Sequence, residues 1–148
     1  MNQELIITAH LASTLFMTGV IWFVQIVHYP LFASIPSEAY PAYERLHQRL
    51  TTWVVAPAMV TELLSGAWIA TFVVDYRNSP LFGLAGAALI IVWLSTVLLQ
   101  VPCHQLLAEK FSPIVHRKLV RSNWIRTLGW SIRSLLLLVL MLTHWSVH

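Results

Sequence analysis

Apolar residues dominate four stretches of the chain, and polar residues gather between them. The stretches cover residues 5–28, 51–74, 80–101 and 124–147. A helix rises about 1.5 Å per residue, so about 20 mainly apolar residues are enough to cross the hydrocarbon of a bilayer. The pattern therefore predicts an all-α integral membrane protein, built as a four-helix transmembrane bundle.

The two long connections, residues 29–50 and 102–122, have a different pattern. In the first, Tyr43, Leu46 and Leu50 fall on one helical stripe between polar positions, and the second interleaves leucines with basic residues. Such stripes are typical of helices that lie at the membrane surface. We therefore expect amphipathic interfacial segments in both connections.

Composition supports a membrane location. Of the 148 residues, 57% are hydrophobic and 10% are charged, whereas soluble domains carry about 25% charged residues. The lipid bilayer is therefore the first partner that we expect, and the length fits one domain, residues 1–148. The net charge of +3 does not indicate nucleic acid, because the nine Lys and Arg residues form no basic patch in the sequence.

The distribution of basic residues predicts the orientation. The termini carry no Lys or Arg, and the short turn between the second and third spans has only Arg77. The long connections hold Arg45, Arg49, Lys110, Arg117, Lys118 and Arg121. Because cytoplasmic loops are enriched in Lys and Arg, we expect a multi-pass inner-membrane protein with both termini on the outer, periplasmic side.

Three charged residues lie inside the predicted spans, where each costs about 2.5–3.5 kcal/mol on insertion scales. Glu62 and Arg133 lie at matching depth, so we predict that Glu62 is within hydrogen-bonding reach of Arg133 or Arg126. In one interpretation this is a structural ion pair that joins the second and fourth spans. In the other, all three are catalytic, with Glu62 as an acid, base or metal ligand and the arginines as an anion clamp.

Histidines and a carboxylate gather at the predicted cytoplasmic end. Glu44 and His47 form an E-x-x-H pair on one helical face, and His28 and His104 close the first and third spans. We expect these four residues to converge on a divalent metal, with iron, zinc, manganese and copper not distinguished. In the alternative interpretation, each histidine bonds a backbone carbonyl or a lipid head group.

Other polar residues extend this hypothesis. Gln25, Gln100 and Asn123 are expected to bind a cofactor or to orient the metal ligands. His10 and His144 lie at similar outer depth, and two facing histidines are an alternative means of holding a haem. Separately, His116 stands next to Arg117 and Lys118, which favours a position on the surface.

The leading hypothesis is a small membrane enzyme, a metal- or cofactor-dependent oxidoreductase that acts on a lipophilic substrate at the cytoplasmic end. The layout resembles that of small four-helix membrane oxidoreductases, which is a likeness of architecture alone. The first alternative is a non-catalytic structural subunit, whose partners are a larger membrane complex or further copies of the chain. A transporter is the third, although no span is interrupted mid-membrane by paired glycine or proline.

Overall fold

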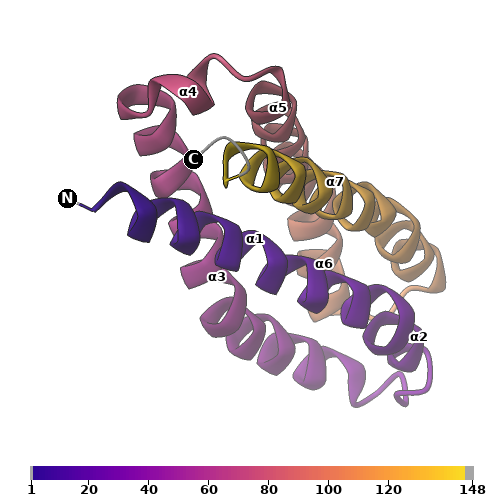
Figure 1. Ribbon diagram of the computed structural model, residues 1–148. Coiled ribbons are helices and arrows are strands. Elements are labelled where there is room, and N and C mark those ends of the chain that lie inside the picture. Colours follow the sequence, from indigo (N-terminus) through magenta and orange to yellow (C-terminus); the bar gives the residue numbers. More distant parts are fainter. Residues whose placement is uncertain (1, 146–148) are drawn as a thin grey trace.

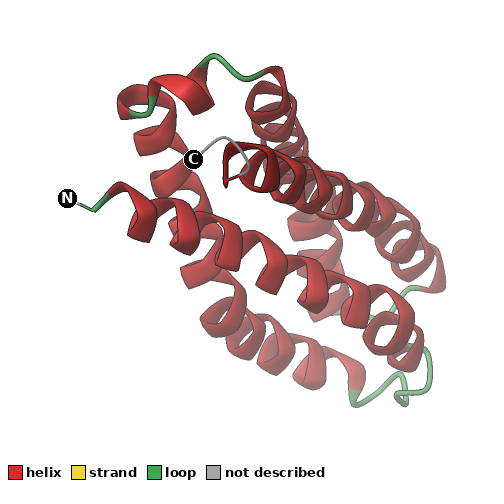
Figure 2. Cartoon of the chain, in the orientation of Figure 1, coloured by secondary structure: helices red, strands yellow, loops and turns green. Residues whose placement is uncertain are grey.

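The computed structural model describes residues 2–145, almost all of them helical (Figure 2). The elements in chain order are α1 (Gln3–Phe23), the π-helical η1 (Val24–His28), α2 (Tyr29–Phe32), α3 (Tyr40–Phe72), α4 (Val74–Arg77), α5 (Pro80–Ser95), the π-helical η2 (Thr96–Gln100), α6 (Val101–Glu109) and α7 (Pro113–Trp145). They join into four continuous helices that are long and apolar enough to cross a membrane. The predicted fold class, a four-helix membrane bundle, is confirmed.

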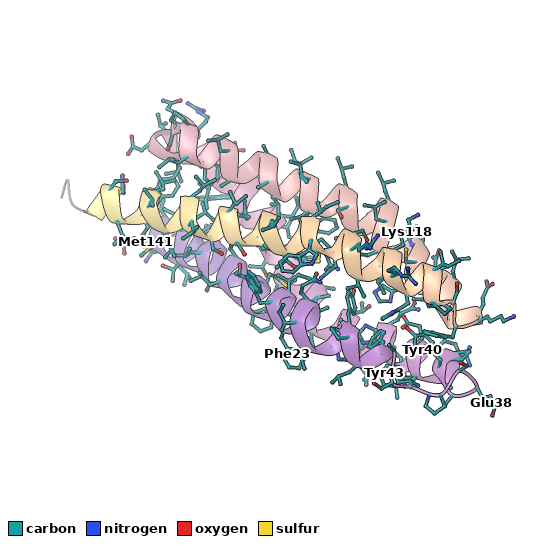
Figure 3. The ribbon with its side chains drawn as sticks, turned by 90° about the vertical axis from the view of Figure 1, so that its right-hand side faces the viewer. Phe23, Glu38, Tyr40, Tyr43, Lys118 and Met141 are labelled. Atoms are coloured by element: carbon teal, nitrogen blue, oxygen red, sulfur yellow. The ribbon has the colours of Figure 1, made fainter. Side chains whose placement is uncertain are left out.

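The helices form a ring in which α3, α1, α7 and α5 follow one another (Figure 1). α6, which continues α5, packs against α3 and closes the ring at one end only. That end also holds α2 and the first turns of α3 and α7, and we call it the polar end. Figure 3 shows Glu38, Tyr40 and Lys118 there, and Met141 near the opposite end.

The amphipathic segments are helical, but they continue the spans instead of forming separate helices. α3 runs unbroken for 33 residues from Tyr40, and α6 extends the third span to Glu109. Other apolar positions hold these segments together, because Tyr40, Leu107 and Leu119 share a buried core cluster. The stripe predicted for the first connection, Tyr43, Leu46 and Leu50, is exposed. The bundle is therefore longer than the predicted spans. Residues 146 and 147 of the expected fourth span lie outside the described residues.

Two of the long helices contain a π-helical turn just before the polar end. The backbone N–H of Tyr29 bonds the carbonyl of Val24, and that of Val101 bonds the carbonyl of Thr96, five residues back in each case. A proline follows directly both times, at positions 30 and 102. A proline has no N–H and crowds the carbonyl four residues earlier, and the wider π turn relieves that crowding.

The buried face of α7 repeats every seven residues along nearly its whole length. The residues in this repeat are His116, Leu119, Asn123, Arg126, Trp130, Arg133, Leu137 and Leu140, and Thr127 and Ser134 are buried next to them. Polar and charged side chains therefore enter the bundle interior at several levels of this one helix. They separate into two groups with different surroundings.

Candidate functional site

The first group surrounds Glu62, near the middle of the bundle, and we call it the Glu62 network. Arg133 donates from Nε to Glu62 Oε1 over 3.0 Å, and Thr14 donates to the same oxygen over 2.6 Å. Trp130 donates from Nε1 to the other oxygen, Oε2, over 3.0 Å. The predicted contact between Glu62 and Arg133 is confirmed, and both carboxylate oxygens have partners.

Arg133 also uses its two remaining nitrogens. Nη1 donates to the carbonyl of Ala85 over 2.6 Å, and Nη2 donates to His10 Nε2 over 2.7 Å. Because that ring nitrogen is an acceptor, Nδ1 of His10 carries the proton and donates to Ser65 Oγ, 2.7 Å away. The network joins α1, α3, α5 and α7. It also engages both ring nitrogens of His10, which leaves neither free for the axial haem bond expected as an alternative.

The second group lies at the polar end, and its centre is a chain of three hydrogen-bonded side chains. His104 Nδ1 and Glu44 Oε1 are 2.6 Å apart, and Tyr29 Oη lies 3.0 Å from His104 Nε2. An ionised carboxylate only accepts hydrogen bonds. His104 Nδ1 therefore carries a hydrogen atom and donates a hydrogen bond to Glu44. The other nitrogen of the neutral ring then accepts from the Tyr29 hydroxyl. We call this chain the Tyr29–His104–Glu44 relay.

The remaining two predicted metal ligands lie beside the relay. His28 Nε2 is 3.0 Å from His47 Nδ1, and the hydroxyl of Thr51 is also 3.0 Å from that atom. The rings of His47 and His104 have centroids 5.5 Å apart. The four residues expected to converge, His28, Glu44, His47 and His104, therefore do lie together.

Hydrogen bonds connect these four residues in two pairs, His28 with His47 and Glu44 with His104. Within the part of the chain that the structure describes, no group of three or more His, Cys, Asp or Glu side chains is set up to hold a metal ion. Glu44 Oε2 is nevertheless buried without a hydrogen-bond partner, although Gln48 donates to the other oxygen, Oε1, over 3.1 Å. One strong acceptor of the cluster is thus unused.

Arg126 lies deeper than the relay, on the same face of α7 as Arg133. It is 8% exposed, its Nη1 donates to Asn123 Oδ1 over 3.2 Å, and its guanidinium carbon lies 5.3 Å from the centroid of the Trp130 ring. Its Nε is buried without a hydrogen-bond partner among the described residues. Tyr29 is close enough for its side chain to interact with that of Arg126.

Of the three predicted cofactor-binding residues, Gln100 lines the cavity described below, and Gln25 and Asn123 do not. Gln25 accepts from Asn123 Nδ2 over 2.9 Å and donates to the carbonyl of Val120. Gln100 accepts from Ser95 and donates to the hydroxyl of Ser122, each over 3.0 Å. Gln25 belongs to η1 and Gln100 to η2, so the two π turns place these amides opposite each other across the fourth helix.

A cavity of about 200 Å³ lies between these groups. Its apolar wall comes mainly from Met17, Val20, Ile21, Val24, Val55 and Val101, and its polar wall from Tyr29, His47, Gln48, Gln100, His104 and Arg126. Of the other predicted site residues, His28, Glu44, Gln25 and Asn123 stand behind this wall, and Glu62 and Arg133 belong to the separate network. Of the three residues expected to be catalytic, only Arg126 lines the cavity.

Two residues at the polar end were not found from the sequence. Tyr29 was missed because its hydroxyl is neutral and its position next to Pro30 suggested only the end of a span. The prediction for His116 was wrong: it is buried, and its Nε2 donates to the carbonyl of Tyr29 over 2.9 Å. The seven-residue spacing of His116, Asn123 and Trp130 is the signal that indicated its inward position.

No protein-family model, no curated protein and no solved structure matches this chain. The cavity and the groups around it are therefore the features of the molecule that bear on its function.

Proposed function

We propose that the protein is a small membrane enzyme that acts on a lipophilic substrate in the polar-end cavity, and that the Tyr29–His104–Glu44 relay moves the proton. The observation that carries this proposal is the relay itself. A hydroxyl on the cavity wall bonds an imidazole, which bonds a buried carboxylate. The same order of groups activates nucleophiles and bases in many enzymes, where the carboxylate holds the tautomer of the imidazole.

The relay supports proton abstraction. A free tyrosine has a pKa near 10, so its hydroxyl needs a neighbouring base in order to act near neutral pH. As the substrate gives a proton to the Tyr29 oxygen, the Tyr29 hydroxyl proton passes to His104 Nε2. The imidazolium formed in this way is stabilised by Glu44, and one negative charge is left on the substrate.

Arg126 stabilises that negative charge on the substrate. Arg126 is one of the residues that line the cavity, it lies next to Tyr29, and its buried Nε has no hydrogen-bond partner among the described residues. A preorganised donor aimed at developing charge in a site shielded from water is among the strongest contributions to catalysis, about 10²–10³ in rate for one donor. The expected reaction is therefore proton removal from a carbon or hydroxyl group whose oxygen becomes an oxyanion.

We further propose that the polar end faces the cytoplasm in an inner membrane. Six of the nine Lys and Arg residues lie in its two connections, which supports this orientation. A reporter that is active only in the cytoplasm, fused to the C-terminus, should give no signal. A strong signal would reverse the orientation and move the cavity to the outer leaflet.

The test of the enzyme is a comparison of membrane lipids. Host cells that express the wild-type chain are compared by mass spectrometry with cells that express Tyr29→Phe or Glu44→Gln. A lipid-soluble species should be depleted, and another should accumulate, in the wild type alone. Tyr76→Phe is the matched control, because Tyr76 is a buried tyrosine in α4, at the opposite end of the bundle.

Identical lipid profiles in all strains, with the variants folded, would reject the enzyme. They would favour the non-catalytic subunit of a membrane complex, whose polar residues only fix the packing of its helices.

A metal-dependent oxidoreductase is the second candidate, favoured by the contact between His28 and His47 and by the unused Glu44 Oε2. In that case His28, Glu44, His47 and His104 hold a divalent metal. Elemental analysis of the purified protein should then find about one metal ion per chain, reduced in a His47→Ala, His104→Ala double variant. Metal at background level in both proteins would exclude this candidate.

A further inference from the structure

We infer that the cavity binds the anionic head group of a single-chain lipid, with Arg126 as its counter-charge and with the hydrocarbon chain in the apolar groove between α1 and α3. The inference deepens the proposed function, because it names the class of substrate. Binding is measurable without turnover. A failure of this inference can therefore be distinguished from a failure of the proposed enzyme function.

Arg126 is buried without a carboxylate partner. The chain has six carboxylate side chains, and four of them are exposed: Glu4, Glu38, Asp75 and Glu109. The two buried carboxylates bond other side chains, Glu62 the guanidinium of Arg133 and Glu44 the imidazole of His104. Within residues 2–145 no carboxylate lies within ion-pair distance of Arg126. A guanidinium stays charged in proteins, and a buried charge without a counter-ion is strongly unfavourable.

The partners of Arg126 are all neutral. Asn123 Oδ1 accepts a hydrogen bond from Nη1, Trp130 lies about 5 Å from the guanidinium, and Tyr29 lies next to it. The buried Nε–H has no partner among residues 2–145, and Arg126 is one of the residues that line the cavity. Carboxylates and phosphates bind an arginine fork with two parallel hydrogen bonds, so an anion that reaches this guanidinium from the cavity supplies the missing counter-charge.

A groove lies beside the cavity. It has a volume of about 460 Å³ and lies along α1 and α3, with Gly19, Phe23 and Val54 among its lining residues. Four side chains line both the groove and the cavity: Val20, Val24, Thr51 and Val55. The two spaces are therefore adjacent between α1 and α3, and we expect the hydrocarbon chain to pass from Arg126 to the bilayer between these four side chains.

The sizes of the two spaces limit the ligand. The cavity, of about 200 Å³, accommodates a carboxylate or a monophosphate with a few methylene groups, since one water molecule occupies about 30 Å³. The groove next to it, of about 460 Å³, has room for one hydrocarbon chain. A single-chain acid or alkyl phosphate fits this outline better than a two-chain phospholipid.

The test is equilibrium binding of radiolabelled oleate and dodecyl phosphate to the full chain in phosphatidylcholine nanodiscs, with empty nanodiscs as the background. Saturable binding of at least one probe is expected, and the tighter probe identifies the head group. Arg126→Leu should weaken it by about tenfold or more, because a charge-assisted hydrogen bond is lost. Arg121→Leu is the matched control, since it removes an exposed positive charge from the same helix and should change nothing.

A second pair of variants tests the groove. A side chain added at Gly19 or at Gly83 meets no other atom within 4 Å at its Cβ, so both positions tolerate a larger residue. Gly19→Phe fills the groove and should weaken oleate by about tenfold, the equivalent of two buried methylene groups. The short chain of octanoate should bind as before. Gly83→Phe, on α5, should leave both probes unaffected.

The outcomes are separable. The inference is overturned if neither probe binds saturably, if a folded Arg126→Leu binds as well as the wild type, or if Gly19→Phe and Gly83→Phe behave alike. If Arg126→Leu does not fold, the comparison of Gly19→Phe with Gly83→Phe alone tests the inference. Oleate binding together with identical membrane lipids in the wild-type and Tyr29→Phe strains would reject the enzyme and keep this inference.

Discussion

Arg126 and Arg133 stand seven residues apart on one face of α7, and both are buried, with 8% and 1% of their surfaces exposed. Each of the three nitrogens of Arg133 has a partner, including the carboxylate of Glu62. Arg126 has a neutral amide, an aromatic ring and the neutral side chain of Tyr29 as neighbours, and its Nε has no partner among the described residues. The same residue type on the same helix therefore has complete surroundings at one level and incomplete surroundings at the other.

The difference separates a structural role from a functional one. Burial alone marked both arginines in the sequence, because any charge within a span is costly. The list of partners distinguishes them: a complete network stabilises the fold, whereas an incomplete one next to a cavity leaves room for a ligand. Sites kept in this state often lower the stability of the protein without ligand.

The largest effect is expected from Glu62→Leu. The substitution leaves the Arg133 guanidinium buried without its counter-ion and should lower the free energy of unfolding by about 3–5 kcal/mol. Detergent- or urea-induced unfolding in micelles, followed by circular dichroism, measures the change. The double variant Glu62→Leu, Arg133→Leu removes both charges and should lose less than the single variant. A single variant as stable as the wild type would contradict the structural role of the network.

Gly66→Ala tests the packing of the same network. The added Cβ would lie 2.9 Å from His10 Cε1, so the His10 ring, which bonds both Arg133 and Ser65, has to shift. We expect a loss of about 1–3 kcal/mol in unfolding free energy, as for other overpacked interiors. Gly86→Ala is the control, because its Cβ meets no atom within 4 Å. Equal stabilities for the two variants would show that His10 moves without cost.

Arg126→Leu should have the smallest effect on stability, within about 1 kcal/mol of the wild type in ligand-free micelles. Removing an unpaired buried charge is favourable, and the lost contact with Trp130 offsets part of that gain. The same unfolding assay measures it, next to Glu62→Leu. A loss comparable to that of Glu62→Leu would mean that Arg126 has a structural partner, and the contrast between the two arginines would disappear.

The level of a residue along a span could be predicted from the sequence. The side of the helix on which the residue lies could be predicted only in part. Counting from the span ends placed Glu62 level with Arg133, and the structure joins them. Arg126 was the other expected partner, but it lies about 10 Å nearer the polar end, because seven residues rise that far in a helix. The convergence of His28, Glu44, His47 and His104 followed from the same counting.

The π turns limited what periodicity reveals. Along α5 the buried positions are three or four residues apart up to Ser95, and the next is Gln100, five residues on. A regular helix has no such step, so the 3.6-residue pattern could not place the interior face beyond Ser95. Tyr29 follows the other π turn and was missed for a related reason. No sequence pattern identifies a π turn directly, although the prolines at 30 and 102 were visible.

The two π turns also separate the membrane core from the polar end. A residue turns an α-helix by about 100°, and a π turn takes up one extra residue, so the helix beyond it keeps nearly the face that it would have without that residue. Deleting one residue between Ser95 and Gln100 would shorten the step between these buried positions from five residues to four and would leave Gln100 and His104 facing the cavity. A regular α-helix with the sequence unchanged would instead turn both side chains about 100° away from it. The π turn therefore sets the direction of the polar-end side chains independently of the packing of α5 against α7 before Ser95.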